Sequence, residues 1–130
     1  MVELTLDTGV REYRIVGGGV LRFHPADPNL YARFLQAEEK LRKIEKEMLK
    51  GGDEDALTRL CKADKAIKKL LSWVFGEEND FHKALNGVNL LSLGGNGKLL
   101  AENLFDALGE ILTEGAERFA ADQVARLKND

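Results

Sequence analysis

The pattern of apolar positions is clearest between residues 28 and 50. After Asp27-Pro28, apolar residues recur at alternating intervals of four and three: Leu30, Phe34, Ala37, Leu41, Ile44 and Met48. This spacing lays one apolar stripe along a helix of about six turns, because an α-helix has 3.6 residues per turn. Asp27 is a suitable N-cap, and Pro28 fits the first helical position. The pattern therefore predicts a helix from Pro28 to about Lys50.

A second stripe predicts a partner for this helix. Within residues 53–75, apolar residues return in a similar register: Leu57, Leu60, Ile67, Leu71 and Val74. Asp53 is the expected N-cap, Gly76 is the expected stop, and Gly51-Gly52 separates the two stripes. Two striped helices joined by a short loop form a hairpin that buries its own seam. Asp64 lies near the second stripe, where it either meets a lysine across the hairpin or fixes the register.

The first 23 residues have a β pattern instead. Val2, Leu4 and Leu6 alternate with polar residues, which is the period of a half-buried strand. Residues 10–16 and 20–23 are predicted as two further short strands. We expect a small antiparallel sheet whose apolar face lies on the helices, because such a sheet is marginal alone. Its exposed edge would be open to pairing with another chain.

The chain beyond Gly76 is broken into shorter pieces. Asn79 or Asp80 is the expected cap of a short helix over residues 81–85. A helix is predicted from Lys98 onward, with a broad apolar face made of Leu100, Leu104, Leu108, Ile111 and Leu112. Gly115 predicts a break near residues 113–115, followed by a less apolar terminal helix.

Together these segments predict a predominantly helical α+β protein. Its small N-terminal antiparallel sheet is followed by a helical hairpin and C-terminal helices. We expect a single domain over residues 1–130, with a β-rich segment at 1–23, the hairpin at 28–75, and the broken segment and C-terminal helices at 80–130.

Length, charge and cysteine content narrow the class of protein. A chain of 130 residues can build a core without disulfide or metal support. The net charge of -3, from 19 basic and 22 acidic residues, argues against a nucleic-acid partner, because phosphate binding needs concentrated positive charge. Cys61 is the single cysteine, which suits a reducing compartment. No membrane span or secretory signal is recognisable, so we expect a soluble protein of the cytoplasm.

Candidate chemistry is sparse. The segment Gly94-Gly95-Asn96-Gly97-Lys98 resembles a phosphate loop, but Ser92 replaces its first glycine and Leu99 its hydroxyl residue, so we interpret it as an elbow. His24 and His82 lack partners at metal-ligand spacing. Cys61 is expected to be a small core residue within the second helix. No catalytic residue, metal site or cofactor is predicted, and we expect no enzyme.

Large apolar residues are the remaining candidates for function. Trp73, Phe75 and Phe81 gather around the stop at Gly76, where they form either ordinary core or the lining of an apolar groove. The C-terminal helix adds further apolar candidates. The residues predicted to contact a protein partner are Trp73, Phe75, Phe81, Leu100, Leu104, Phe105 and Leu108.

Three stretches in order along the chain suggest a family. They are residues 23–34, beginning Phe23-His24-Pro25-Ala26-Asp27-Pro28, then Trp73-Val74-Phe75-Gly76, and Asn96-Gly97-Lys98 before the apolar C-terminal helix. In this order the chain resembles the small tail assembly chaperones of tailed phages and prophages of Gram-positive bacteria.

This resemblance implies a non-enzymatic protein of the host cytoplasm. It would coat apolar helical segments of the tape measure protein before tail tube subunits polymerise around it. The implied partners are the tape measure protein and other copies of the same chain, with the tail tube protein as a further candidate. A structural tail or head-completion component is the main alternative. A regulator or nucleic-acid adaptor and an enzyme are weaker ones.

Overall fold

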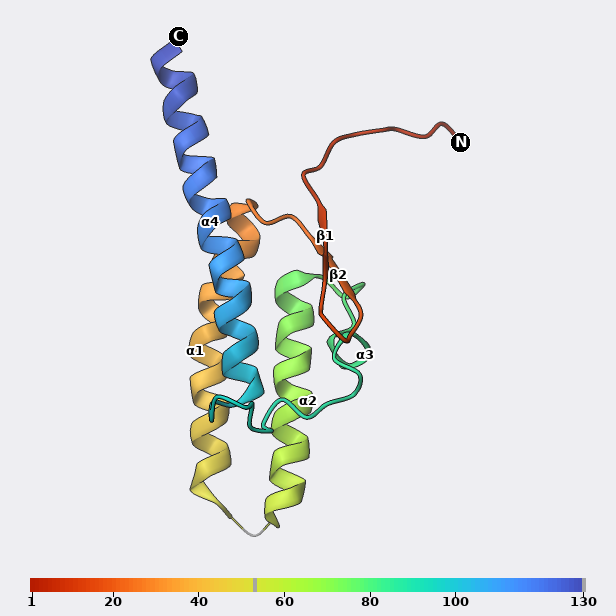
Figure 1. Cartoon of the computed structure of the whole chain (residues 1–130), viewed down its shortest axis with the longest axis vertical. Helices are drawn as coiled ribbons and strands as arrows, with labels where there is room; N and C mark the ends of the chain where they lie inside the picture. Colours follow the sequence, from red (N-terminus) through yellow and green to blue (C-terminus); the bar gives the residue numbers. More distant parts are fainter. Residues whose placement is uncertain (53, 130) are drawn as a thin grey trace.

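The computed structural model describes residues 1–52 and 54–129. In this part of the chain, the strands are β1 (Arg11–Arg14) and β2 (Val20–Phe23), and the helices are α1 (Pro28–Lys50), α2 (Ala56–Phe75), α3 (Phe81–Ala84) and α4 (Leu100–Asn129). The predicted fold class is confirmed, since a small antiparallel sheet precedes a mostly helical chain. Helices α1 and α2 form an upright hairpin, α4 lies alongside them, and the C-terminal turns of α4 project beyond the rest of the molecule (Figure 1).

The helical hairpin follows its predicted boundaries closely. Asp27 caps α1, and its carboxylate accepts a hydrogen bond of 2.9 Å from the backbone N–H of Asn29. Helix α2 ends at Gly76 as predicted. Asp53, the predicted cap of α2, lies outside the described residues, and Asp55 is the N-cap. The predicted stripe of α1 supplies its buried residues, namely Leu30, Phe34, Ala37 and Leu41.

The sheet has two strands, so the prediction of a first strand at residues 2–6 is wrong. Residues 1–10 contain no strand, and Val2, Leu4 and Leu6 are 95%, 89% and 70% exposed. This N-terminal arm, defined as residues 1–8, leads away from the molecule (Figure 1). Alternation predicts a strand only where a surface buries every second side chain, and none of the described residues covers the arm.

Asn79 binds the outer edge of β2 at Arg22. Its side-chain Oδ1 accepts from the backbone N–H of Arg22 at 2.7 Å, and its Nδ2 donates to the carbonyls of Arg22 and Phe75 at 2.8 Å each. Asn79 is 2% exposed, so its side-chain amide is buried. One amide therefore takes the place of a neighbouring strand and ties β2 to the end of α2.

A chain of aromatic rings joins the sheet to the helices. The ring of Tyr13 stacks on Phe23, Phe23 meets Phe75, and Phe75 meets Phe34, at centroid distances of 4.6, 4.8 and 6.2 Å. Phe34 then stacks on Phe105 of α4 at 5.5 Å. Large rings in edge or stacked contact bury much apolar area and gain a specific geometry. This chain of rings fixes β1, β2, α2, α1 and α4 to one core.

Helix α4 runs without interruption from Leu100 to Asn129, so the predicted break near Gly115 is wrong. A Cβ atom at Gly115 would lie 2.0 Å from the carbonyl oxygen of Pro25. The glycine therefore allows the chain before α1 to touch the helix backbone. Glycine costs about 1 kcal/mol of helix propensity relative to alanine, and the packing of α4 overrides this cost.

Glu45 on α1 is held in an unfavourable environment. Its Oε1 is buried without a hydrogen-bond partner among the described residues. Burial and the nearby carboxylate of Glu102 raise the pKa of Glu45, while Arg42 acts in the opposite direction. A carboxyl group whose pKa is higher in the folded state favours folding when protonated, and this advantage is lost as the pH rises through that pKa.

We therefore expect Glu45→Gln to raise the free energy of unfolding at pH 7. The gain should shrink toward zero at about pH 3.5, where glutamate is protonated in both states. Urea denaturation at the two pH values measures both quantities. Glu39→Gln, an exposed position on the same helix, is the control and should change little at either pH. A loss of stability for Glu45→Gln at neutral pH would contradict this account of the site.

Candidate protein-binding surface

The structure separates the residues predicted to contact a partner. Four of them belong to the core, because Phe75, Phe105 and Leu108 are 4% exposed and Phe81 is 1% exposed. Their rings and side chains are committed to packing inside the molecule. Trp73 is 43% exposed, and Leu100 and Leu104 are half-buried. Only these three of the predicted residues contribute to the surface.

Trp73 lies apart from the other two. It lines a cleft of about 660 Å³ together with Val20, Leu30 and Arg33. The ammonium group of Lys40 lies 4.4 Å from the centroid of the tryptophan ring, in a cation–π contact. The guanidinium group of Arg33 donates to the carbonyl of Val74 at 2.9 and 3.1 Å. The ring of Trp73 is thus already in contact with the Lys40 ammonium group of the same chain.

Leu100 and Leu104 belong to a second apolar stripe on α4. Together with Ala107 and Ile111 they recur at intervals of four, three and four, so they share one flank of the helix. The flank of α4 that faces the core is a different one and carries the buried residues Ala101, Phe105, Leu108 and Leu112. The opposite flank faces α1, because a Cβ at Gly109 would lie 3.5 Å from the ring of Phe34. The stripe therefore points away from α1. We call Leu100, Leu104, Ala107 and Ile111 the lateral stripe.

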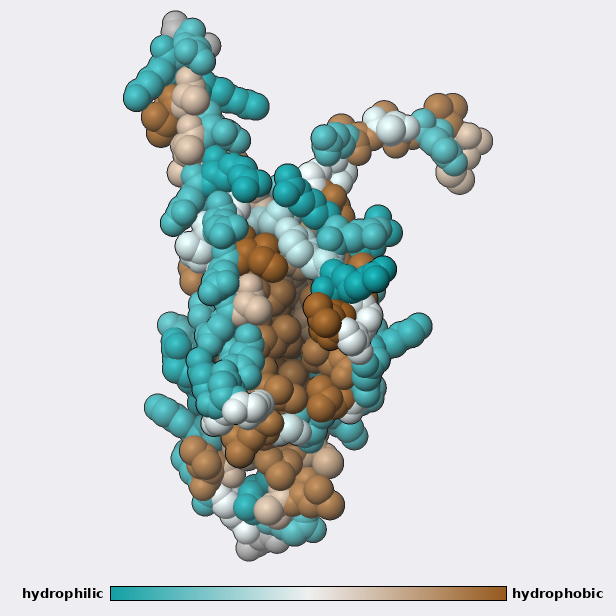
Figure 2. Space-filling view, in the orientation of Figure 1, coloured by the Kyte–Doolittle hydropathy of each residue, from teal (hydrophilic) through white to brown (hydrophobic). Residues whose placement is uncertain are grey.

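The lateral stripe leads into a groove between α4 and β1. Tyr13 and Ile111 both line a cleft of about 510 Å³ at one end of it. The rim of this cleft is charged and polar, with Asp7, Arg11, His24, Glu114 and Arg118. In the space-filling view, apolar side chains gather on this face between α4 and the side formed by the β1–β2 hairpin and α3 (Figure 2). A long apolar surface with a polar rim is the form of a helix-binding groove.

Sequence reasoning missed Tyr13 and Ile111 as binding candidates. The signal for Ile111 was present, because the lateral stripe has its own helical period beside that of the core positions. Whether the side chain of Tyr13 lines a groove depends on how the sheet docks onto the helices. That docking is a long-range property, which no local pattern reveals.

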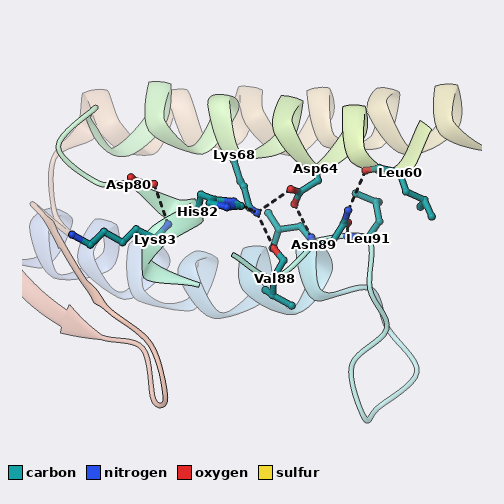
Figure 3. A network of polar contacts seen from close by, with 10 residues as sticks. Leu60, Asp64, Lys68, Asp80, His82, Lys83, Val88, Asn89 and Leu91 are labelled. Carbon is teal, nitrogen blue, oxygen red and sulfur yellow. Dashed lines mark hydrogen bonds and ion pairs between the residues drawn. The ribbon is translucent and has the colours of Figure 1, made fainter. Parts of the chain in front are cut away.

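The second notable site is a buried polar network around Lys68 (Figure 3). The ammonium group of Lys68 contacts Asp64 Oδ2 at 2.9 Å, His82 Nδ1 at 2.7 Å and the carbonyl of Val88 at 2.8 Å. Asp64 Oδ1 accepts from the backbone N–H of Leu90 at 2.8 Å. The side chains of Lys68 and Asp64 are 9% and 10% exposed. The network fastens the segment between α3 and α4 to α2.

Of the two alternatives for Asp64, a lysine partner across the hairpin is wrong, since its partner Lys68 lies one turn later on the same helix. The network also brings His82 near a carboxylate, which a catalytic site would require. However, an ammonium group has three N–H donors, and in Lys68 all three have acceptors. All three donors of Lys68 are thus used to hold the segment between α3 and α4 against α2.

The other candidate chemical residues are scattered. Cys61 is exposed, so the prediction that it is a core residue is wrong: it occupies the outward face of α2. The Nδ1 atom of His24 accepts from the backbone N–H of Ala26 at 3.1 Å and shapes the turn before α1. Among the described residues, no group of three or more histidine, cysteine, aspartate or glutamate side chains is arranged to hold a metal ion.

Comparisons of this chain with protein-family models, with curated proteins and with solved structures give no match. Within residues 1–52 and 54–129, no helix combines the length and the apolar character that crossing a membrane requires.

Proposed function

We propose that this protein is a non-enzymatic assembly chaperone that binds apolar helical segments of a phage tape measure protein during tail assembly. The observation that supports the proposal is the lateral stripe. Leu100, Leu104 and Ile111 are half-buried on one flank of α4, and Ile111 lines the cleft beside β1. The resemblance of residues 23–34, 73–76 and 96–98 to tail assembly chaperones supplies the identity of the client.

The groove matches the chemistry of such a client. An amphipathic helix places anchors at intervals of three and four residues, and the lateral stripe offers apolar contacts with the same period. Glu114 and Arg118 at the end of the groove can pair with charges that flank the apolar face of a client. A moderate affinity at each groove suffices, because many copies along one long client supply avidity and each copy can still leave as the tube grows.

Leu104→Asp is the direct test of this surface. We expect about tenfold weaker binding of the tape measure protein, because a carboxylate in the groove opposes burial of an apolar helix. Co-expression with the tape measure protein of the same genome, followed by affinity capture and titration, measures the effect. Thr113→Asp on another flank of α4 is the matched control, because Thr113 is exposed and outside the stripe.

Phe105→Asp cannot serve this test, because Phe105 stacks on Phe34 inside the core and its replacement should unfold the protein. Wild-type chain that captures no tape measure protein would refute the proposal. Folded Leu104→Asp that binds as well as Thr113→Asp would move the contact away from the lateral stripe.

The alternative function, a structural tail or head-completion component, predicts a different distribution. A chaperone of the host cytoplasm should be missing from purified particles, whereas a structural subunit should be present in a fixed copy number. Mass spectrometry of purified particles separates the two. Under the proposal, the further partners are the tail tube protein and other copies of this chain, with no role for nucleic acid or membrane.

A further inference from the structure

The two outer edges of the sheet differ. Asn79 occupies the outer edge of β2. Directly after β1, the N–H of Ile15 donates to the carbonyl of Gly19 at 2.9 Å, and Tyr13 of β1 stands opposite Leu21 in the same register. Because hydrogen-bonded and non-hydrogen-bonded pairs alternate in antiparallel strands, the backbone groups of Glu12 and Arg14 point outward. Within the described residues, nothing covers these groups on the outer side.

The N-terminal arm has the composition of the missing strand. Its apolar residues Val2, Leu4 and Leu6 alternate with Glu3, Thr5 and Asp7, and they are among the most exposed apolar side chains of the molecule. Such exposure of alternating apolar residues is costly in water and is relieved when a strand is added to a sheet edge. The arm reaches away from its own β1 (Figure 1).

One antiparallel register fits the arm to β1 in both shape and charge. When Leu4 stands opposite Tyr13, Val2 stands opposite Ile15, so the apolar residues of both strands share one face. In the same register Glu3 lies opposite Arg14, which pairs opposite charges directly. A slip by one residue would turn Leu4 onto the face of Glu12 and Arg14.

Gly9 makes this register possible within a continuous chain. The apolar positions are even-numbered in the arm, whereas Tyr13 in β1 and Ile15 directly after it are odd-numbered. A strand in regular alternation cannot change its apolar face, so one residue must leave the pattern. Gly9 has a φ of 77°, a conformation that favours glycine, and its N–H donates to Asp7 Oδ1 at 3.0 Å.

We propose that the N-terminal arm of one copy pairs with β1 of a second copy, and that the exchange is reciprocal about a two-fold axis. In each copy, the arm and β1 then form one long strand. The long strands of the two copies lie side by side, and the β2 strand of each copy flanks them on the outside. The free β1 edge of each copy is then paired, and the apolar residues of both arms are buried. Isologous contacts of this kind are the usual basis of a dimer. The inference concerns the chain alone and stands whether or not it binds a tape measure protein.

Disulfide trapping tests the proposal in the full chain. Residues directly opposite each other in a hydrogen-bonded antiparallel pair have Cα atoms about 5.5 Å apart, within the range of a disulfide. Two single variants, Glu3→Cys and Arg14→Cys, are made in a Cys61→Ser background, mixed and oxidised. We expect a disulfide-linked dimer on a non-reducing gel, and about tenfold less product for Glu3→Cys mixed with Glu12→Cys, where the pair lies on a diagonal.

The outcomes separate exchange from its competitors. Neither single variant alone should form the dimer efficiently, because the same position in the two copies lies far apart in the proposed sheet. A chain with both Glu3→Cys and Arg14→Cys that yields only an internal disulfide, with no product from the mixed single variants, would show that the arm folds back on its own β1 and would overturn the proposal. Absence of both products would overturn it as well.

Discussion

Replacing Lys68 with methionine is expected to lower the free energy of unfolding by about 3–5 kcal/mol. Methionine has nearly the shape of the lysine stem but carries no charge, so it leaves the carboxylate of Asp64 buried without its partner. It also removes the donor to the carbonyl of Val88, and that carbonyl would lose its bond of 2.8 Å. Urea denaturation of the purified protein at pH 7 measures the loss.

A second substitution separates charge from packing. In Lys68→Met with Asp64→Asn, the neutral amide oxygen can still accept from the N–H of Leu90, but no charge is left unpaired. We expect this double variant to recover much of the loss, because the uncompensated charge is the main penalty in a broken buried pair. Lys98→Met is the surface control: it breaks the exposed pair with Asp106 and should have a much smaller effect. Equal losses for Lys68→Met and Lys98→Met would contradict the role of the network.

Gly115→Ala should destabilise the protein by about 1–3 kcal/mol, as expected for an overpacked contact. The new methyl group would lie 2.0 Å from the carbonyl oxygen of Pro25, so the segment before α1 must move away from α4. Backbone atoms cannot adjust as a flexible side chain can. Thermal or urea unfolding of the variant measures the effect.

Gly109→Ala on the same helix is the matched control and should have the opposite sign. Its Cβ would make an ordinary contact of 3.5 Å with the ring of Phe34. Alanine then gains up to about 1 kcal/mol of helix propensity. If both variants stabilised the protein alike, α4 and the Pro25 segment would not be in close contact.

The local features of the fold were predictable from the sequence. The boundaries of α1, the cap at Asp27 and the stop of α2 at Gly76 follow from apolar spacing and from residues that act within one turn. Each of these features depends on neighbours in the chain. Asp80 likewise caps α3, one of two alternatives that the sequence left open.

The predictions that failed depend on contacts between distant segments. Gly115 predicted a break because glycine weakens an isolated helix, but its role is to admit the carbonyl of Pro25. Residues 2–6 had the period of a strand, yet a strand also needs an edge to pair with. Asp64 was correctly picked out as unusual, but its partners at Lys68 and Leu90 depend on how the loop after α3 folds over α2.

The candidate surface was predictable in part. Leu100 and Leu104 were chosen because they are large and apolar, and they do reach the surface. Phe105 and Leu108 were chosen for the same reason, but they point into the core. Size and hydropathy do not separate the two groups. Only the angular position around α4 does so, and the direction of the core around a helix is set by what packs against it.

The side-chain amide of Asn79 hinders the addition of further chains to the β2 edge of the sheet. A small sheet with two bare edges could add chains on both sides and extend into a fibre, which is the hazard of unprotected strands. Since Asn79 already satisfies the N–H and C=O of Arg22, an incoming strand cannot pair with Arg22 on that side. In the proposed exchange, association through this sheet starts at β1, and the reciprocal pairing of the two arms ends it in a closed pair.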